Sequence, residues 1–104
     1  MFNKTISKQL TQIMQLCYQI NHEETHREKT GNLPTVFLDF MGHTCQLNIR
    51  VYADGWMSGE DPDFSGKVYL DENPDDVSAE LAKLIERLGV TLKLKARKER
   101  KRNV

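Results

Sequence analysis

The 104-residue sequence is poor in several residue types, and each shortage excludes a class of protein. The two cysteines, Cys17 and Cys45, are too few for a disulfide framework and too far apart for a C-x-x-C metal pair. No apolar run approaches the roughly 20 residues that a membrane span needs, and MFNKTISKQL lacks the apolar core of a signal peptide. We therefore expect a cytoplasmic protein without membrane contact, in which both cysteines are buried free thiols.

Charge is distributed unevenly, although 15 basic and 15 acidic residues balance to a net charge of zero. Residues 93–102 contain seven basic residues against one acid, Glu99, so this segment carries +6 and the remainder must carry −6. At this length we expect one small domain, residues 1–97, followed by a basic C-terminal tail, residues 98–104.

An apolar period of 3.6 residues predicts a helix near the N-terminus. The residues that recur at spacings of four, three, four and three are Ile6, Leu10, Ile13, Cys17 and Ile20. Asn3 or Thr5 could cap the start of this helix. The apolar stripe stops after residue 20, and Gly31 and Pro34 are expected to end any continuation.

Three stretches of period-two alternation predict an antiparallel meander. The first, residues 35–41, is expected to turn through Gly42-His43 into the second, residues 44–53. An acidic loop over residues 58–66 separates the second stretch from the third, residues 67–71. The inward residues of the second stretch are Cys45, Leu47, Ile49 and Val51.

A second helix is predicted to begin at Asn73-Pro74-Asp75-Asp76, where asparagine caps, proline fits the first helical position and two aspartates favour the positive end of the helix dipole. Gly89 is expected to end it. Residues 90–97 alternate apolar and polar side chains and are predicted as a fourth strand, because Gly89-Val90-Thr91 is poor helix material. A continuing helix is the alternative, with Leu88, Leu92 and Ala96 on one face.

The predicted fold class is therefore α+β, a two-layer sandwich in the order α-β-β-β-α with a possible final strand. Two helices are expected to cover one face of the meander. The core should bring Leu47, Ile49 and Val51 against helix residues Leu10, Ile13, Leu81, Leu84 and Ile85.

The stretch HEETH, residues 22–26, fits H-E-x-x-H, in which two histidines one helical turn apart bind zinc and the glutamate activates water. A catalytic zinc needs a third ligand and an enclosed site. Here the flanks are polar, Lys29 stands where the extended motif has glycine, and His43 is predicted in a turn. We therefore predict no catalytic residues, no cofactor and no resident metal; if any metal binds, His22 and His26 would hold it.

Three surfaces could bind a partner, and ordinary solvation is the alternative for each. The outer sheet face should present residues that could contact a protein or stack on bases, namely Phe37, Arg50, Tyr52 and Tyr69. An acidic surface on the loop and second helix comprises Glu60, Asp61, Asp63, Asp75 and Asp76. The basic residues that could neutralise nucleic-acid phosphates are Lys93, Lys95, Arg97, Lys98, Arg100, Lys101 and Arg102.

The order helix, three strands, helix, with Gly42-His43 in the first turn, resembles the double-stranded-RNA-binding domain. That resemblance implies lysines at the start of the second helix, which grip phosphates across a groove. This chain has Asp75 and Asp76 there, and their carboxylates would repel the RNA backbone. We therefore expect the topology of that family but not its function.

Residues 35–72 contain the motifs GH, NIRVYADGW and VYLDE, with which the chain resembles small accessory proteins of bacterial prophages. The layout and acidic loops are also similar to some anti-CRISPR inhibitors, which occupy nucleic-acid sites with carboxylates. The resemblance implies a phage-type accessory protein that binds a protein partner, such as a host nucleic-acid-binding or defence protein. The alternative is a nucleic-acid-associated protein that uses the basic tail and the sheet face; a zinc protein built on HEETH comes third.

Overall fold

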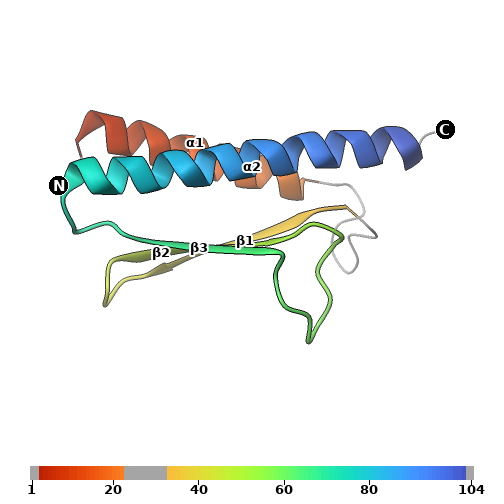
Figure 1. The fold of residues 1–104 in the computed structure, drawn as a ribbon, viewed down its shortest axis with the longest axis horizontal. Coiled ribbons are helices and arrows are strands. Elements are labelled where there is room, and N and C mark those ends of the chain that lie inside the picture. The colour runs from red at the N-terminus through yellow and green to blue at the C-terminus, as the bar shows by residue number, and fades with distance from the viewer. Residues whose placement is uncertain (1–2, 23–32, 103–104) are drawn as a thin grey trace.

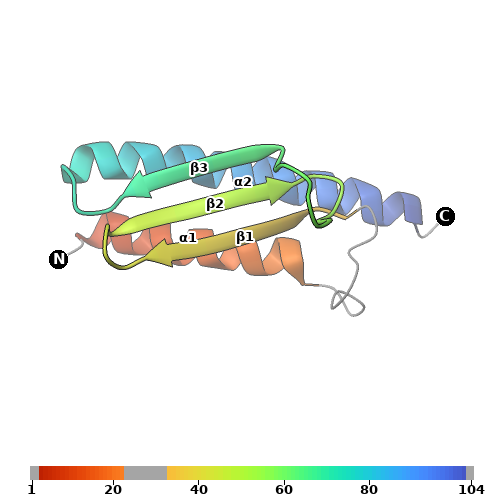
Figure 2. The same cartoon turned by 90° about the horizontal axis from the view of Figure 1, so that it is seen from below.

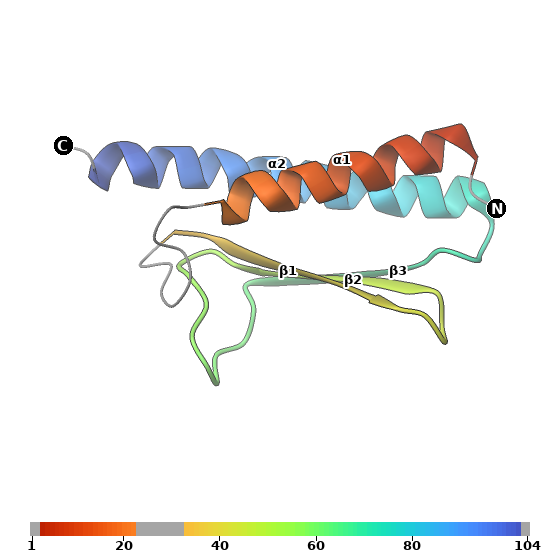
Figure 3. The same ribbon diagram turned by 180° about the vertical axis from the view of Figure 1, so that it is seen from behind.

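The computed structural model describes residues 3–22 and 33–102, in which two helices and three strands form a two-layer α+β sandwich (Figure 1). In chain order the elements are α1 (Lys4–Asn21), β1 (Thr35–Met41), β2 (Gln46–Tyr52), β3 (Phe64–Tyr69) and α2 (Pro74–Arg102). Both helices lie on one face of the antiparallel sheet, and no described element covers the other face (Figures 1 and 3). The predicted fold class is confirmed. Neither of these helices combines the length and apolar character that a bilayer span requires.

Helix α1 starts at the predicted cap, Asn3, and ends before Gly31 and Pro34, the residues expected to end a continuation. The Asn3 side chain accepts a hydrogen bond from the backbone N–H of Ile6 at 2.8 Å, which satisfies a donor of the first turn. The helix ends at Asn21, directly after the last apolar residue of the stripe. The side chains that it buries are Ile6, Ile13, Cys17 and Ile20.

The central strand β2 provides the sheet's contribution to the core. It pairs antiparallel with β1 and β3, and its inward residues Leu47, Ile49 and Val51 are buried. The core cluster around these residues includes Ile13, Leu81 and Leu84, with Leu10 and Ile85 partly buried against it. The predicted core is therefore confirmed, together with the register that separates inward from outward residues.

The boundaries of β2 and β3 differ from the predicted ranges, residues 44–53 and 67–71. The chain turns through residues 42–45, with Cys45 in the left-handed region at φ 55°, so β2 begins at Gln46. Strand β3 begins at Phe64, and the assignment of residues 64–66 to the acidic loop is wrong. Phe64 packs against the core, and a Cβ on Gly66 would come within 2.8 Å of Leu84 Cδ2. Gly66 thus marks a close approach of α2 to β3 rather than a loop.

Helix α2 runs unbroken from Pro74 to Arg102, so the predicted stop at Gly89 and the predicted strand over residues 90–97 are both wrong. Its start is as expected, because the Asn73 side chain accepts from the Asp75 N–H at 2.9 Å. Beyond Gly89 the inward face continues with Thr91 and Lys95, both buried. Glycine in a helix costs about 1 kcal/mol relative to alanine, and the packing of this second half against α1 offsets that cost. Residues 98–102 continue the same helix, with no break at the predicted boundary after residue 97.

Lys95 joins the second half of α2 to the end of α1. Its side chain is buried, with 6% relative exposure, and its ammonium donates to the carbonyl oxygens of Gln19 at 2.7 Å and His22 at 2.8 Å. The last carbonyls of a helix have no partner within the helix and carry the negative end of its dipole. Lys95 therefore acts as a C-terminal cap supplied by another helix.

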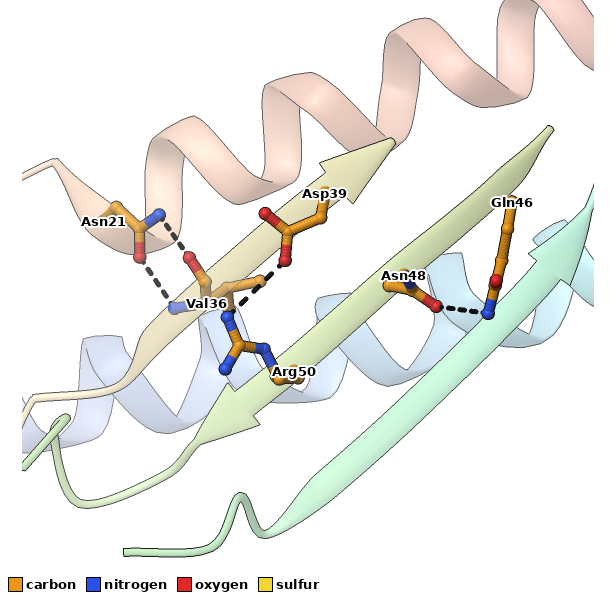
Figure 4. A network of polar contacts seen from close by, with 6 residues as sticks. All are labelled: Asn21, Val36, Asp39, Gln46, Asn48 and Arg50. Atoms are coloured by element: carbon orange, nitrogen blue, oxygen red, sulfur yellow. Dashed lines mark hydrogen bonds and ion pairs between the residues drawn. The ribbon is translucent and has the colours of Figure 1, made fainter. Parts of the chain in front are cut away.

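Asn21 performs a related task at the edge of the sheet (Figure 4). Its amide donates to the carbonyl oxygen of Val36 at 2.8 Å and accepts from the Val36 N–H at 2.8 Å. Since β1 is an edge strand of the described sheet, no strand among residues 3–22 and 33–102 pairs with these two backbone groups. The asparagine side chain thus replaces one residue of a missing neighbouring strand.

Candidate functional site

The open sheet face consists of the outward residues of the three strands, on the side away from the helices. Strand register arranges the residues in three rows, which are Phe37–Arg50–Ser65, Asp39–Asn48–Lys67 and Met41–Gln46–Tyr69. Tyr52 extends the same face of β2 beyond the first row. Period-two alternation along β2 predicted these orientations, so the expected sheet-face residues do share one side.

An aromatic cluster occupies one end of this face. The ring of Phe37 meets Tyr52 edge-on at 5.6 Å between centroids and Trp56 at 6.0 Å. The guanidinium of Arg50 lies over the Phe37 ring, 4.8 Å from its centroid. Tyr52 is only 4% exposed, whereas Trp56 is 47% exposed. The cluster therefore presents Trp56 to solvent, supported by Phe37, whose ring also contacts Tyr52.

Polar contacts hold the neighbouring side chains in place (Figure 4). Arg50 Nη2 lies 3.5 Å from Asp39 Oδ2, and both side chains are about half exposed. Such a surface pair contributes at most about 1 kcal/mol, so it orients Arg50 more than it stabilises the fold. Gln46 donates to Asn48 Oδ1 at 2.8 Å. Arg50 is therefore held between an aromatic ring and a carboxylate.

The β2–β3 loop, Ala53 to Asp63, projects on the open side of the sheet (Figures 1 and 3). The Ala53 N–H donates to Asp63 Oδ2 at 2.6 Å, and the Asp63 N–H donates to the Val51 carbonyl at 2.8 Å, which closes the base of the loop. Gly55 and Gly59 have φ of 94° and 87°, the left-handed conformation that glycine adopts without strain.

Helix α2 also anchors this loop. The Lys98 ammonium donates to the Ala53 carbonyl at 2.8 Å and to Asp54 Oδ1 at 2.7 Å. The loop is therefore tied at its base to both its own strand and the helix layer. It carries Trp56 together with exposed Met57, Glu60 and Asp61.

The five acidic residues predicted as one binding surface lie in two places. Glu60, Asp61 and Asp63 belong to the β2–β3 loop, whereas Asp75 and Asp76 belong to the first turn of α2, at the opposite end of the molecule (Figures 1 and 2). Asp63 is engaged in closing the loop. Glu60 and Asp61 are thus the exposed acidic residues that share the loop with Trp56.

The predicted basic set is likewise divided by the structure. Lys95 caps α1 and Lys98 anchors the loop, so both have structural roles. Lys93, Arg97 and Arg100 are exposed and follow each other at helical spacings of four and three, which places them on one flank of α2. Lys101 and Arg102 complete the helix.

The HEETH stretch lies mostly outside the described residues, since only His22 among residues 22–26 is described. His22 follows the last residue of α1, and its ring stacks on Tyr18 at 5.1 Å. The prediction about His26 therefore stays a prediction. Within residues 3–22 and 33–102, no group of three or more histidine, cysteine or acidic side chains could hold a metal ion.

The two cysteines are both free thiols. Cys17 is buried in the core, and burial raises its pKa from 9.0 to about 11, so the thiol stays protonated at neutral pH. Cys45 is only half-buried, so the expectation of two buried thiols is confirmed for Cys17 alone.

Sequence reasoning missed two residues of the site, Trp56 and Met57. Neither residue belongs to the expected sheet-face, acidic or basic sets. The sequence does contain a signal for this site. The single tryptophan lies in a polar, acidic loop, where an exposed large apolar side chain indicates a binding surface.

The fold and this surface define a small α+β sandwich with one open sheet face, on whose side a loop carries an exposed aromatic residue and two exposed acidic residues. The chain matches no protein-family model, no curated protein and no solved structure.

Proposed function

We propose that this protein acts by binding another protein rather than by catalysis, and that the contact surface is the loop-side half of the open sheet face. The observation that carries the proposal is the half-exposed Trp56, held against Phe37 beside Arg50. Tryptophan, tyrosine and arginine are the residues that most often dominate protein–protein binding energy, especially where neighbouring residues support them. A phage-type accessory protein, such as an inhibitor of a host protein, would act in this manner.

The chemistry of the loop narrows the kind of partner. Met57 is strongly exposed next to Trp56, and Glu60 and Asp61 lie a few residues further along the same loop. An apolar anchor flanked by carboxylates fits a protein surface with an apolar pocket and a basic rim. Because Asp75 and Asp76 lie at the other end of the molecule, they are not part of this contact (Figure 1).

Base stacking is less well supported on this face. A stacking surface needs several accessible ring faces, but Tyr52 is buried and the guanidinium of Arg50 covers Phe37. Tyr69 lies two rows, about 13 Å, from Arg50 along the strands. Trp56 therefore stands alone as an exposed ring at this end of the face.

A direct test compares matched variants of the full chain. Immobilised wild-type protein is used to capture partners from a nuclease-treated lysate of the source cells, and the captured protein is then purified and titrated calorimetrically. We expect Trp56→Ala to weaken binding by at least thirtyfold, about 2 kcal/mol. Val90→Ala, which changes an equally exposed residue on α2, should leave the affinity unchanged.

The charge contribution is tested in the same titration. Glu60→Lys with Asp61→Lys should weaken binding, whereas Asp75→Lys with Asp76→Lys should not. Asp63 is left intact because its carboxylate closes the loop. Full affinity in both Trp56→Ala and Arg50→Ala would show that the partner contacts a different surface.

Nucleic-acid binding through α2 is the second candidate, favoured by one observation. The basic segment is helical through Arg102, so Lys93, Arg97 and Arg100 are already arranged along one flank before any ligand binds. A preorganised segment loses less entropy on binding than a mobile one. The open face of the sheet points away from the helix layer (Figure 1). A nucleic-acid segment bound along α2 would therefore contact the helix and not the open sheet face.

Fluorescence anisotropy with a labelled 20-base-pair duplex separates the two candidates. If α2 binds phosphates, replacing Lys93, Arg97 and Arg100 with glutamine should weaken binding and reduce the slope of log affinity against log salt by about 0.9 for each contact removed. Lys95 and Lys98 remain in place because they support the fold. Equal binding by wild type and the triple variant at 50 mM salt would exclude this candidate.

A further inference from the structure

Helix α2 is longer than the sheet that it helps to cover. At about 1.5 Å per residue its 29 residues span about 43 Å, whereas a seven-residue strand such as β2 spans about 24 Å. The second half of the helix therefore passes beyond the core and over the base of the β2–β3 loop (Figures 1 and 2). In the described part of the helix, Leu88 is the last residue among the buried members of the core cluster. Beyond it, Lys95 and Lys98 turn toward the other elements and bond their backbone carbonyls.

Lys98 bonds the loop at one particular peptide group. The Gly55 N–H donates to the Tyr52 carbonyl at 3.3 Å, so residues 52–55 form a β-turn at the end of β2. The Lys98 ammonium donates at 2.8 Å to the Ala53 carbonyl, which belongs to the central peptide of that turn. The two common turn types, I and II, differ in the orientation of this peptide. Lys98 therefore fixes the conformation of the turn from another element.

The same turn is also held from within the loop. The Ala53 N–H donates to Asp63 Oδ2 at 2.6 Å, so Ala53 is bonded through its N–H to the far end of the loop and through its C=O to α2. Lys98 also donates to Asp54 Oδ1 at 2.7 Å, but Asp54 is 85% exposed and such a surface pair contributes little. The Lys98 side chain is only 15% exposed. Its bond to the Ala53 carbonyl is therefore the main anchor of the turn to α2.

Trp56 follows this turn directly in the chain. Gly55, with a φ of 94°, redirects the backbone at the end of the turn. The chain then brings Trp56 back to the sheet, where its ring meets Phe37 at 6.0 Å between centroids. The direction in which the backbone leaves the turn decides whether the Trp56 ring reaches Phe37. The position of Trp56 therefore depends on the peptide that Lys98 holds.

We propose that Lys98 is a positioning residue of the partner-binding surface, because it holds the turn in the conformation that packs Trp56 on Phe37 before a partner arrives. This inference rests on the proposed function, in which Trp56 is the main anchor. A loop that is ordered beforehand binds more tightly, since ordering it on binding costs free energy. The second half of α2 thus controls the affinity of a surface in the other layer. Substitution of Lys98 weakens protein binding without any involvement of nucleic acid.

Fluorescence of the free protein tests this role, because Trp56 is the only tryptophan in the chain. We expect Lys98→Met to raise the quenching of Trp56 by acrylamide and to lower its fluorescence anisotropy, with an unchanged circular dichroism spectrum. Lys98→Gln, whose side chain is polar but shorter, should have the same effect, so the result does not depend on how methionine is accommodated. Lys93→Met and Lys93→Gln, which remove a cation from the exposed side of the same helix, should match wild type.

Lys95→Met separates positioning of the loop from stability of the fold. Lys95 also lies on the inward side of α2 and bonds backbone carbonyls, but these belong to Gln19 and His22 at the end of α1. This variant should be less stable in urea and yet show wild-type quenching of Trp56 in its native state. Wild-type quenching in both Lys98 variants, or an equal increase in Lys95→Met, would overturn the proposal.

The affinity for the captured partner gives a second readout. Lys98→Gln should weaken binding by about two- to tenfold, which corresponds to the cost of ordering one side chain on binding, whereas Lys93→Gln should not weaken it. The two proposals fail separately. Full affinity in both Trp56→Ala and Arg50→Ala would disprove the proposed surface while the fluorescence result stands. Unchanged Trp56 fluorescence in the Lys98 variants would disprove the positioning role while the proposed surface stands.

Discussion

The ammonium of Lys95 lies 2.7 Å from the carbonyl oxygen of Gln19, a residue 76 positions earlier in the chain. This contact caps α1 with a side chain of α2 and explains why a lysine is buried between two helices. We expect Lys95→Met to lower the free energy of unfolding by about 2–3 kcal/mol, because it keeps the aliphatic length but leaves two carbonyls without their donor. Urea denaturation measures the change. The exposed neighbour is the control: Lys93→Met should stay within about 0.5 kcal/mol of wild type.

Asn21 and Asn48 allow the same substitution to be compared in two environments. Asn21→Asp removes the donor to the Val36 carbonyl and sets a carboxylate against that oxygen, so we expect a loss of about 1–3 kcal/mol. Asn48 only accepts, from Gln46, so Asn48→Asp keeps its contact and should change stability little. Thermal and urea unfolding of both variants tests this difference. Similar losses would mean that the Asn21 amide does not bridge the β1 edge.

The glycines of β3 and α2 should respond to alanine in opposite directions. A Cβ at position 66 would lie 2.8 Å from Leu84 Cδ2, so Gly66→Ala should destabilise by about 1–3 kcal/mol through overpacking. At Gly89 such a Cβ would meet no atom within 4 Å apart from the backbone of its own helix and the adjacent residues, and alanine is the better helix former. Gly89→Ala should therefore stabilise by about 0.5–1 kcal/mol. A stabilised Gly66→Ala would show that α2 does not approach β3 so closely.

Burial of Cys17 predicts how stability depends on alkaline pH. The pKa of this thiol is raised from 9.0 to about 11 in the folded protein, so the unfolded chain ionises first. The stabilising contribution is complete below pH 9 and is lost as pH rises from 9 to 11. At about 1.4 kcal/mol per pKa unit, the loss is roughly 2–3 kcal/mol.

The measurement compares wild type with Cys17→Ala in urea at pH 8, 9, 10 and 11. Other titrating groups are common to both proteins, so the difference between them isolates Cys17. We expect the wild-type advantage to shrink as pH rises through this window. A constant difference would argue against a buried, protonated thiol.

Local sequence signals predicted much of the fold. The alternation along β2 identified Leu47, Ile49 and Val51 as core residues because a one-residue shift would expose all three. Asn73 and Pro74 identified the start of α2, since helix caps depend on neighbouring residues only. These features require no knowledge of distant parts of the chain.

The errors arose where a distant contact outweighed local preference. The residues Gly89, Val90 and Thr91 have low helix propensity. The chain is nevertheless helical there, because Thr91 and Lys95 are buried and Lys95 bonds the end of α1. Gly66 resembled a loop residue because its neighbour Leu84 lies on another element. The site was only partly predicted for the same reason: alternation identified Phe37 and Arg50, but the position of Trp56 depends on how its loop returns to the sheet.

The dependence of both α1 and the sheet on α2 has a consequence for synthesis in the cell. Leu81, Leu84 and Leu88, which complete the core, emerge from the ribosome only after every strand has been made. Synthesis proceeds at about 5–20 residues per second. The apolar sides of α1 and β2 therefore stay exposed for seconds on each nascent chain, until the apolar residues of α2 can pack against them. Productive folding must therefore await α2, and until then the nascent chain is a natural substrate for chaperones that shield apolar segments.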